Sequence, residues 1–287
     1  MMDKGKVTDA GLDALTQAVQ RAFENTPEPR LKEIMTLLVK HLHGFAREAR
    51  LTQEEWLQGI RFLTEVGQTC SDVRQEFILL SDVLGLSMLT VELNDAKPPG
   101  CTAPTVFGPF HVEHAPRYDN GQDIGNGAIG KPCVIRGSVR SLSGRAIPHA
   151  SVEVWQADDE GLYDVQKTNV SHAQARGILQ TRADGTFDFR SVVPEPYPIP
   201  ADGPVGKLLH ASRRSAWRPA HLHFMIKALG HETLITHVFR RGDRFLRSDP
   251  VFGVRDCLVA DWTLQPDGST LLAFDFVLNP CSEETGS

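Results

Sequence analysis

The sequence predicts an α+β protein in which an N-terminal helical domain, residues 1–100, precedes an antiparallel β-sandwich domain, residues 101–287. Three observations carry this prediction. Apolar residues recur at helical spacing between about residues 8 and 93, a proline-containing segment at 94–100 interrupts the pattern, and short β-like runs separated by turn residues follow. Many short strands with Gly, Pro and Asp between them are typical of a sandwich.

The helical part contains several amphipathic stretches. One apolar face consists of Leu12, Leu15, Val19 and Phe23. Thr52-Gln53-Glu54-Glu55 has the form of a capping box, in which a threonine and a glutamate side chain bond each other's backbone amides at the start of a helix. A further helix is predicted through Phe77 and Leu80, and the prolines within 94–100 end the helical pattern because they cannot continue it.

The second part consists of strands and turns. The β-like runs cover residues 134–139, 151–155, 186–189, 220–226, 233–239 and 271–278. Turn sequences such as Ala183-Asp184-Gly185 and Gln265-Pro266-Asp267-Gly268 separate them. This alternation predicts two packed sheets.

Composition argues against several function classes. The 287 residues are 41% hydrophobic, which is enough for one large core or for a main domain with an appendage. A formal charge of −6, a pI near 6.0 and the lack of a basic patch interleaved with aromatics argue against nucleic-acid binding. No window reaches the length of a membrane span and the N-terminus does not resemble a signal peptide, so we expect a cytoplasmic protein without membrane insertion. The five cysteines lack CxxC spacing and are expected to be free thiols without a catalytic role.

Two histidines, His221 and His223, stand two residues apart in the strand-like run 220–226. In a strand, residues i and i+2 project from one face, so both imidazoles point to one side while the alternate residues face the core. His41 and His43 have the same spacing, but their neighbours have helical periodicity, and helix residues two apart point away from each other. The first pair is therefore a candidate ligand pair, and the second is not.

Two of the three tyrosines fall in the same region. Tyr163 follows a turn at residues 158–161, and Tyr197 is held between two prolines whose backbone angles are fixed. Two phenols with His221 and His223 make a four-ligand set suited to iron(III), because phenolate oxygen favours a trivalent ion. Such an ion would keep both phenols ionised although their free pKa is about 10. The alternative for each tyrosine is a packed ring with a hydrogen-bonded hydroxyl.

Residues 155–164, 196–198 and 218–224 together resemble the intradiol ring-cleaving dioxygenases, and the likeness covers nearly the whole chain. It includes a helical N-terminal third of the kind found in catechol and hydroxyquinol 1,2-dioxygenases, and the linker at 104–110. The resemblance implies cleavage of an ortho-diphenol with O2 and one iron(III) per subunit. It also implies a homodimer joined through the N-terminal helices, with a phospholipid at the interface. A helical cap on one side of the sandwich is the alternative to the dimer.

The resemblance assigns catalytic roles to Tyr197 and Arg218. Tyr197 would leave the iron when the diphenol binds and would take up a substrate proton. Arg218 would stabilise negative charge that develops on the ring. On the sequence alone, a salt bridge to a nearby carboxylate explains Arg218 equally well. His237 stands where catechol 1,2-dioxygenases carry a glutamine, and its role is open between a supporting hydrogen bond and an ordinary strand position.

The resemblance also implies a substrate pocket whose positions resemble the hydroxyquinol branch. The pocket would draw on Leu80, Asp82, Val83, Val106, Phe107, Gly108, Pro109, Phe110, Ile199, Pro200 and Val251. Asp82 stands near where catechol-cleaving relatives have an apolar residue or proline. A carboxylate there would accept a hydrogen bond from a third ring hydroxyl, and a site built around that bond rejects substrates that lack it. The predicted substrate is hydroxyquinol (benzene-1,2,4-triol), cleaved to 3-hydroxy-cis,cis-muconate, the tautomer of maleylacetate.

Three alternatives remain open on the sequence. If Asp82 is a solvated aspartate at a helix end, catechol or a chlorocatechol becomes the expected substrate. A non-catalytic sandwich module with a helical dimerisation domain would contain packed tyrosines and histidines and would be colourless. A zinc hydrolase fits less well, because zinc sites rarely use two tyrosines.

Overall fold

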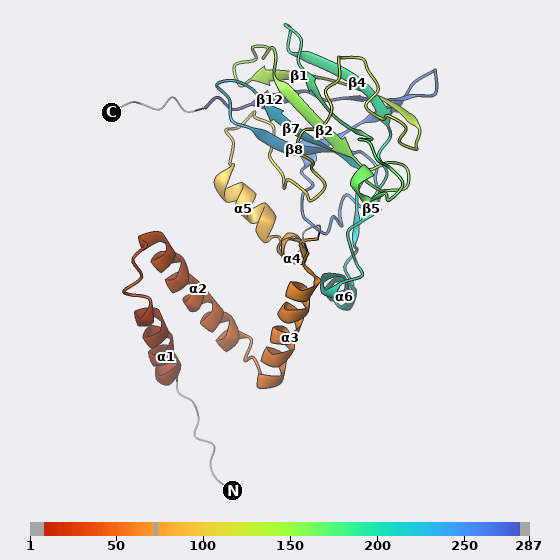
Figure 1. Ribbon diagram of the computed structural model, residues 1–287. Coiled ribbons are helices and arrows are strands. Elements are labelled where there is room, and N and C mark those ends of the chain that lie inside the picture. Colours follow the sequence, from red (N-terminus) through yellow and green to blue (C-terminus); the bar gives the residue numbers. More distant parts are fainter. Residues whose placement is uncertain (1–8, 72–73, 282–287) are drawn as a thin grey trace, which may run out of the picture. The chain divides into compact units, whose positions relative to one another are not determined.

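Two compact units make up the chain, and they divide between Glu65 and Val66. The computed structural model describes residues 9–71 and 74–281, and Figure 1 labels their elements along the chain. The first unit contains α1 (Asp9–Ala22), α2 (Pro29–Glu48) and most of α3 (Gln53–Thr69). The second contains the strand layers with α4 (Glu76–Val83), α5 (Leu86–Asn94) and α6 (Pro204–Ala211). A domain boundary at residue 100 rests on composition and stays a prediction.

Local signals account for the helices of the first unit. Thr52 N–H donates to Glu55 Oε2 at 2.8 Å, and Glu55 N–H donates to Thr52 Oγ1 at 3.2 Å, so the predicted capping box is present at the start of α3. His41 and His43 both lie within α2. Thr16 Oγ1 of α1 lies 2.9 Å from His43 Nδ1, which joins α1 to α2.

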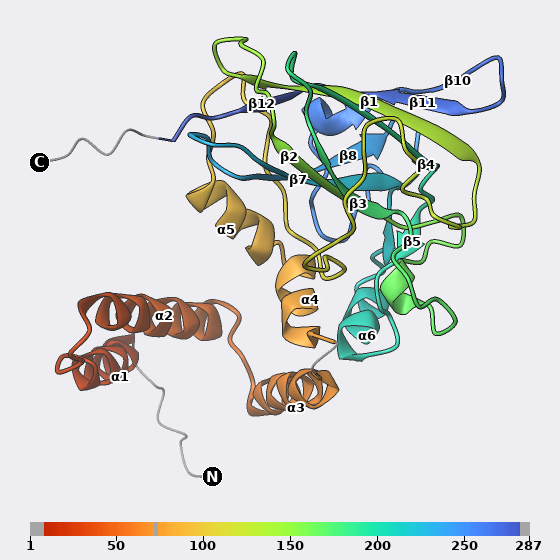
Figure 2. The same ribbon diagram turned by 45° about the horizontal axis from the view of Figure 1, so that its top comes forward.

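Two five-stranded sheets form the sandwich (Figure 2). The first sheet has the order β10-β11-β1-β12, with β4 paired to β1, and comprises β1 (Pro132–Ser141), β4 (Thr186–Val192), β10 (Trp262–Leu264), β11 (Thr270–Ala273) and β12 (Phe276–Leu278). The second has the order β3-β2-β7-β8-β9 and comprises β2 (Ser151–Gln156), β3 (Arg176–Gln180), β7 (His221–Lys227), β8 (Leu234–Arg240) and β9 (Val259–Ala260). A separate two-stranded ladder joins β5 (Tyr197–Pro198) to β6 (Trp217–Arg218).

The sheets are mixed, so the prediction of an antiparallel sandwich is only partly right. β1 runs parallel to β11 and β12, and β8 runs parallel to β9, whereas β1–β4, β2–β3, β2–β7 and β7–β8 are antiparallel. The run at 271–278 is two strands, β11 and β12, separated by residues 274 and 275; the Phe274 carbonyl oxygen occupies the space that a Cβ on Gly137 would need. Residue alternation locates strands but carries no information on their direction.

The helix expected through Phe77 and Leu80 is α4, while α6 is a helix that the sequence pattern did not indicate. Pro204 opens α6 at the first helical position, where its missing N–H has no helical partner to lose. Val205 N–H donates to Glu76 Oε1 of α4 at 3.1 Å. α4 and α6 therefore lie side by side (Figure 2).

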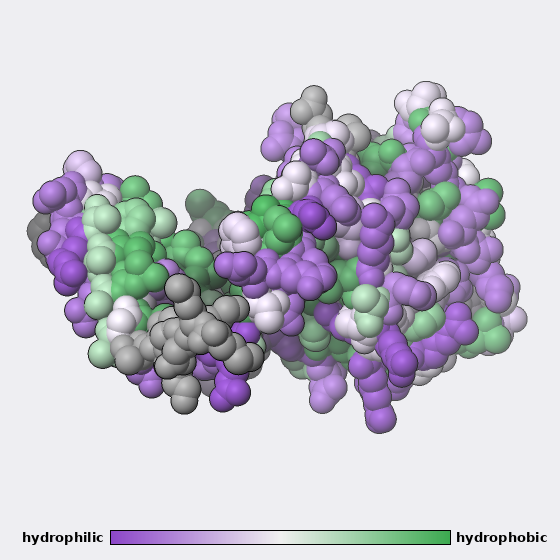
Figure 3. All heavy atoms as spheres, turned by 90° about the horizontal axis from the view of Figure 1, so that it is seen from below, coloured by the Kyte–Doolittle hydropathy of each residue, from purple (hydrophilic) through white to green (hydrophobic). Residues whose placement is uncertain are grey.

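Apolar side chains gather on the surface of the first unit, which Figure 3 shows in green. On α2, five of the exposed ones follow helical spacing and form a stripe made of Leu31, Ile34, Leu38, Leu42 and Phe45, and Leu37 beside them is exposed as well. Among the helices of residues 9–71 and 74–281, none is long and apolar enough to cross a membrane. A contiguous apolar stripe on a protein surface marks a site of association.

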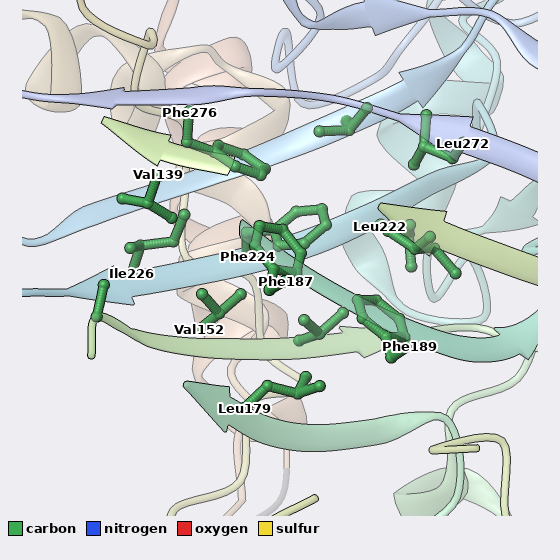
Figure 4. Close-up of a cluster of buried hydrophobic side chains, with 14 of the residues drawn as sticks. Val139, Val152, Leu179, Phe187, Phe189, Leu222, Phe224, Ile226, Leu272 and Phe276 are labelled. Atoms are coloured by element: carbon green, nitrogen blue, oxygen red, sulfur yellow. The ribbon is translucent and has the colours of Figure 1, made fainter. Parts of the chain in front are cut away.

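The sandwich core lies between the inner faces of the two sheets (Figure 4). Leu222, Phe224 and Ile226 of β7 point into it and are fully buried. Each such side chain stabilises the fold by roughly 1.5–3 kcal/mol relative to exposure. This alternation places His221 and His223 on the opposite face of β7.

Candidate metal centre

β7 presents two histidines on the face turned away from the core. His221 and His223 are buried, and their Nε2 atoms lie 3.1 Å apart. The neighbouring strand β8 places His237 directly opposite His223. Ring nitrogens of these three residues lie within 4.8 Å of one another, so this part of the described chain could hold a metal ion.

Short segments outside the two five-stranded sheets bring two phenols to the histidines. Tyr163 follows a turn at Gly161, whose φ is +73°, and a Cβ on that glycine would lie 3.0 Å from the Cβ of Tyr197. Tyr197 begins β5, and its pairing with β6 sets it opposite Arg218. The two phenol oxygens are 3.4 Å apart, and Tyr163 Oη lies 2.9 Å from His223 Nε2.

The four donor atoms have the separations expected of ligands that share one ion. The distances along the series His221 Nε2, His223 Nε2, Tyr163 Oη and Tyr197 Oη are 3.1, 2.9 and 3.4 Å. Two donors bound to one ion at about 2.0–2.1 Å are roughly 2.8–3.4 Å apart when they subtend about 90–110°. Two imidazole nitrogens and two phenol oxygens form a donor set that fits a hard trivalent ion.

Hydrogen bonds on the remote side of each imidazole fix its orientation. His221 Nδ1 lies 2.7 Å from the Pro219 carbonyl oxygen. A carbonyl accepts, so Nδ1 carries the proton and Nε2 presents its lone pair to the site. His223 Nδ1 lies 2.8 Å from His237 Nε2, and His237 Nδ1 lies 2.9 Å from Thr105 Oγ1. This is the arrangement by which an outer residue orients a ligating histidine.

Burial keeps the histidines neutral. Burial is the main cause that holds the pKa of His221, His223 and His237 well below the usual range, and the charge of Arg218 adds to it. For His223 and His237 the charge of a neighbouring histidine contributes as well. Burial also raises the pKa of Tyr163 well above its ordinary value, and the second phenol adds to the shift. Neutral imidazole is the form that binds metals, whereas a buried phenolate needs a strongly charged partner.

Arg218 is a buried cation beside two of the donor atoms. Its Nη1 lies 3.5 Å from Tyr197 Oη and 3.3 Å from His221 Nε2. Its Nε donates to Asp249 Oδ1 at 3.1 Å, so the salt bridge considered for Arg218 is also present. Burial alone would lower the pKa of Arg218, but the Asp249 carboxylate reverses this and the pKa is raised. Asp249 in turn accepts a hydrogen bond from Gly253 N–H at 3.0 Å.

Two aromatic rings and a glycine pack round the four candidate donor residues. Phe110 stacks on Tyr163 with ring centroids 4.4 Å apart, and Trp155 stacks on His223 at 4.8 Å. Gly108 has φ +80°, and a Cβ there would lie 2.8 Å from His223 Cε1. A larger residue at position 108 would displace the His223 ring.

Asp82 lies at the end of α4 and is buried, with 9% of its surface exposed, which counts against a solvated aspartate. Burial raises the pKa of its carboxyl, while the Ser87 hydroxyl and the charge of Arg218 oppose the shift. The Asp82 carboxyl therefore lies close enough to the Arg218 guanidinium for the two charges to interact.

The other predicted pocket residues differ in burial. Leu80, Val83, Val106, Ile199 and Val251 are buried, Pro200 is half-buried, and Phe107 and Pro109 are exposed. The ring of Phe107 packs against Trp155 and His111, with centroids 5.7 and 4.6 Å apart. Their contacts with a substrate stay a prediction.

A buried ion pair behind Tyr163 supports the site. Arg176 Nε donates to Asp164 Oδ2 at 2.7 Å, and Arg176 Nη1 donates to the Phe110 carbonyl at 3.0 Å. Burial would raise the pKa of Asp164, but the hydrogen bonds from Arg176 outweigh it and lower the pKa. Because Asp164 directly follows Tyr163, the pair fixes both the phenol and the ring that stacks on it.

The local sequence carries no sign of several of these residues. Arg176 belongs to a segment that no motif marks, and Asp164 lies within the segment 155–164 but has no predicted role there. Asp249 and Thr105 are single polar residues far along the chain from Arg218 and His237. Trp155 shares a face with His223 because β2 pairs with β7, and that register follows from the fold.

Comparison with known proteins places the chain in a family. The family model "Dioxygenase" matches residues 106–280, and the model "Catechol dioxygenase N terminus" matches residues 28–102. A 6-chlorohydroxyquinol 1,2-dioxygenase from Cupriavidus pinatubonensis is 62% identical over 93% of this chain and 96% of that protein. A hydroxyquinol 1,2-dioxygenase from Nocardioides simplex is 48% identical over 93% of this chain and 94% of that protein.

A solved structure shows that the similarity extends to the fold. The hydroxyquinol 1,2-dioxygenase of Pseudomonas putida DLL-E4 superimposes with a TM-score of 0.91 at 41% identity, covering 96% of this chain and all (100%) of that one. Both the helical part and the strand part of the chain are thus matched. The chain belongs to the intradiol ring-cleavage dioxygenase family.

Proposed function

We propose that this chain is a hydroxyquinol 1,2-dioxygenase. It would cleave benzene-1,2,4-triol between its two adjacent hydroxylated carbons and place both atoms of O2 in the product, 3-hydroxy-cis,cis-muconate. The observation that carries the proposal is the convergence of four donor atoms from Tyr163, Tyr197, His221 and His223. The names of the relatives described above support the choice of substrate.

The proposed metal is iron(III), one ion per subunit, held by Tyr163, Tyr197, His221 and His223. Phenolate oxygens favour a trivalent ion, and the tautomer of His221 leaves its Nε2 lone pair available. When bound, the ion would act as a Lewis acid toward the diphenol oxygens. His237 contacts the remote nitrogen of His223 and lies outside this ligand set.

One residue of the chain would accept a substrate proton, and a second would stabilise negative charge. Tyr197 would accept a proton from a substrate hydroxyl at its Oη, which lies 3.5 Å from Arg218 Nη1. The guanidinium stays charged, and Asp249 fixes its position, so it can stabilise a phenolate and the negative charge that develops on the ring. The contact of Arg218 with both Tyr197 and His221 supports this role.

Asp82 would select the third ring hydroxyl. The Ser87 hydroxyl lowers the pKa of the Asp82 carboxyl and so favours its charged form, and a carboxylate has lone pairs for further donors. A buried acceptor left without its partner is costly, so a ring lacking that hydroxyl would be a poorer substrate. Catechol and chlorocatechols are disfavoured on this ground.

A chlorinated hydroxyquinol is the second candidate substrate. The relative from Cupriavidus pinatubonensis, at 62% identity, is named for 6-chlorohydroxyquinol. Such a ring keeps the three hydroxyls, so it satisfies the same acceptor at Asp82.

The proposal includes a cytoplasmic homodimer with a phospholipid at its interface. The α2 stripe, in which Leu42 and Phe45 are 54% and 59% exposed, is an apolar surface that a second subunit would cover. The acyl chains of the phospholipid would cover further apolar surface at the same interface. The five cysteines are free thiols, which suits a reducing compartment.

The test is the visible absorption spectrum of the purified protein, with its iron content, before and after anaerobic addition of hydroxyquinol. A broad tyrosinate-to-iron(III) band that moves to longer wavelength on addition would support the metal, its phenolate ligands and direct substrate binding. A colourless protein that takes up no iron on reconstitution would remove the ligand assignment. Relative turnover of hydroxyquinol, 6-chlorohydroxyquinol and catechol then decides the substrate.

A further inference from the structure

We propose that Arg214 is a positioning residue for substrate selection. Its guanidinium joins the end of α4, which carries Asp82, to the loop at residues 249–253. That loop carries Asp249, the partner of Arg218. The inference rests on the proposed function, because it concerns how the site distinguishes hydroxyquinol from catechol.

The guanidinium of Arg214 binds two backbone carbonyls at once. Its Nη1 donates to the Val83 carbonyl oxygen at 2.6 Å, and its Nη2 donates to the Pro250 carbonyl oxygen at 3.0 Å. Val83 ends α4, where the last carbonyls have no helical partner and favour a nearby positive charge. A planar fork holds two acceptors at a fixed separation, which a lysine ammonium does not.

Each of these carbonyls belongs to the residue that directly follows a buried carboxylate, Asp82 in one case and Asp249 in the other. Arg218 binds Asp249 at 3.1 Å, and its charge acts on the carboxyl of Asp82. By joining the two carbonyls, Arg214 fixes the separation of the two carboxylates that act on Arg218.

The loop also packs on the turn that follows α4. Phe252 has φ +58°, a left-handed conformation that residues other than glycine rarely adopt. Its ring lies 5.0 Å from the Arg214 guanidinium, and a Cβ on Gly85 would lie 3.4 Å from it. Such a strained conformation persists only where neighbouring groups hold it in place. Here those groups include Arg214 and the turn at Gly85.

The backbone of Arg214 is itself held in place. Its N–H donates to the Leu209 carbonyl of α6 at 2.9 Å. At the other end of α6, Val205 N–H donates to Glu76, the first residue of α4. The segment from α6 to Arg214 therefore contacts α4 at both of its ends.

The test compares Arg214→Met and Arg214→Lys with a matched control, Arg213→Met, at the exposed neighbouring position. For each variant kcat/KM is measured on hydroxyquinol and on catechol, together with iron per subunit and the visible spectrum. We expect both Arg214 variants to lower the hydroxyquinol-to-catechol ratio by about tenfold or more while iron content and spectrum stay as in the wild type. The Arg213→Met protein should keep the wild-type ratio. If Arg214→Met does not fold, Arg214→Lys still decides the question.

A double variant tests whether Arg214 acts through Asp82. When Arg214→Lys is combined with Asp82→Ala, we expect the ratio of the Asp82→Ala protein alone, because the two changes remove one interaction. Equal loss on both substrates, an unchanged ratio in the Arg214 variants, or additive losses in the double variant would overturn the assignment. A wild-type protein that cleaves neither diphenol would instead remove the proposed function, and this outcome is visible before any variant is compared.

Discussion

His237 Nε2 lies 2.8 Å from Nδ1 of His223, the ring nitrogen on the opposite side from Tyr163. When His223 Nε2 offers its lone pair, Nδ1 carries the proton and donates it to His237. His237 must then be protonated on Nδ1, where Thr105 Oγ1 accepts at 2.9 Å. One side chain on β8 thus fixes the tautomer of a proposed ligand on β7.

Replacing His237 by leucine should weaken metal binding, because the buried N–H of His223 then loses its acceptor. We expect roughly 10–100-fold weaker iron affinity in competition with a chelator, as is typical when an outer partner of a ligating histidine is removed. His237→Gln retains an acceptor and serves as the matched control, with iron loss between the wild type and the leucine variant. Iron retained equally by His237→Leu and the wild type would contradict the role.

Arg176→Met should destabilise the fold, because it leaves Asp164 buried without its cation. Removing one partner of a buried pair costs about 3–5 kcal/mol in the free energy of unfolding. Arg241, which pairs with Asp261 on the surface with 57% and 74% exposed side chains, supplies the control. Arg241→Met should change stability by about 0–1 kcal/mol. Denaturant unfolding measures the change in the free energy of unfolding for both variants. Equal changes would show that the Arg176–Asp164 pair contributes no more than a surface pair.

The pKa of Asp164 gives this pair a pH dependence. Its pKa is lowered in the folded protein, so the folded state holds the proton less tightly than the unfolded chain. The stabilisation is therefore present above the ordinary carboxyl pKa and is lost as the pH falls through the folded pKa. The stability difference between wild type and Arg176→Met should shrink in acid, and a constant difference would contradict the pairing.

Asp82 should behave in the opposite way. Burial raises its pKa, so the folded state binds the proton more tightly and the ionised carboxylate destabilises the fold as the pH rises through that pKa. We expect Asp82→Asn to keep or raise the thermal midpoint at neutral pH while lowering kcat/KM on hydroxyquinol relative to catechol. In the wild type that ratio should fall as the pH drops through the raised pKa, and in Asp82→Asn it should be flat over the same range. Equal losses on both substrates would remove Asp82 from substrate selection.

Much of the donor set follows from local pattern. Alternation along 220–226 puts His221 and His223 on one face whatever the strand's neighbours are, and the prolines round Tyr197 confine it without reference to the rest of the chain. Asp249 lies 31 residues from Arg218, and their pairing depends on a loop path that no periodicity encodes. The alternation of apolar residues carries no information on strand direction either. The parallel pairing of β1 with β11 and β12 could therefore not be predicted.

The α2 stripe should control the oligomeric state. Leu38 and Leu42 are exposed and one helical turn apart, so Leu38→Gln with Leu42→Gln places two amides at the centre of the stripe. We expect the proposed dimer to dissociate at concentrations where the wild type remains associated, as measured by sedimentation, and the proposed lipid to be absent from the same preparation. Lys40→Gln introduces the same side chain on the opposite face of α2 and should leave the dimer intact.

The site residues lie outside the first unit, so a monomeric variant that retains iron and activity would show that catalysis does not depend on assembly. A double variant that sediments like the wild type would show instead that this stripe is not the interface.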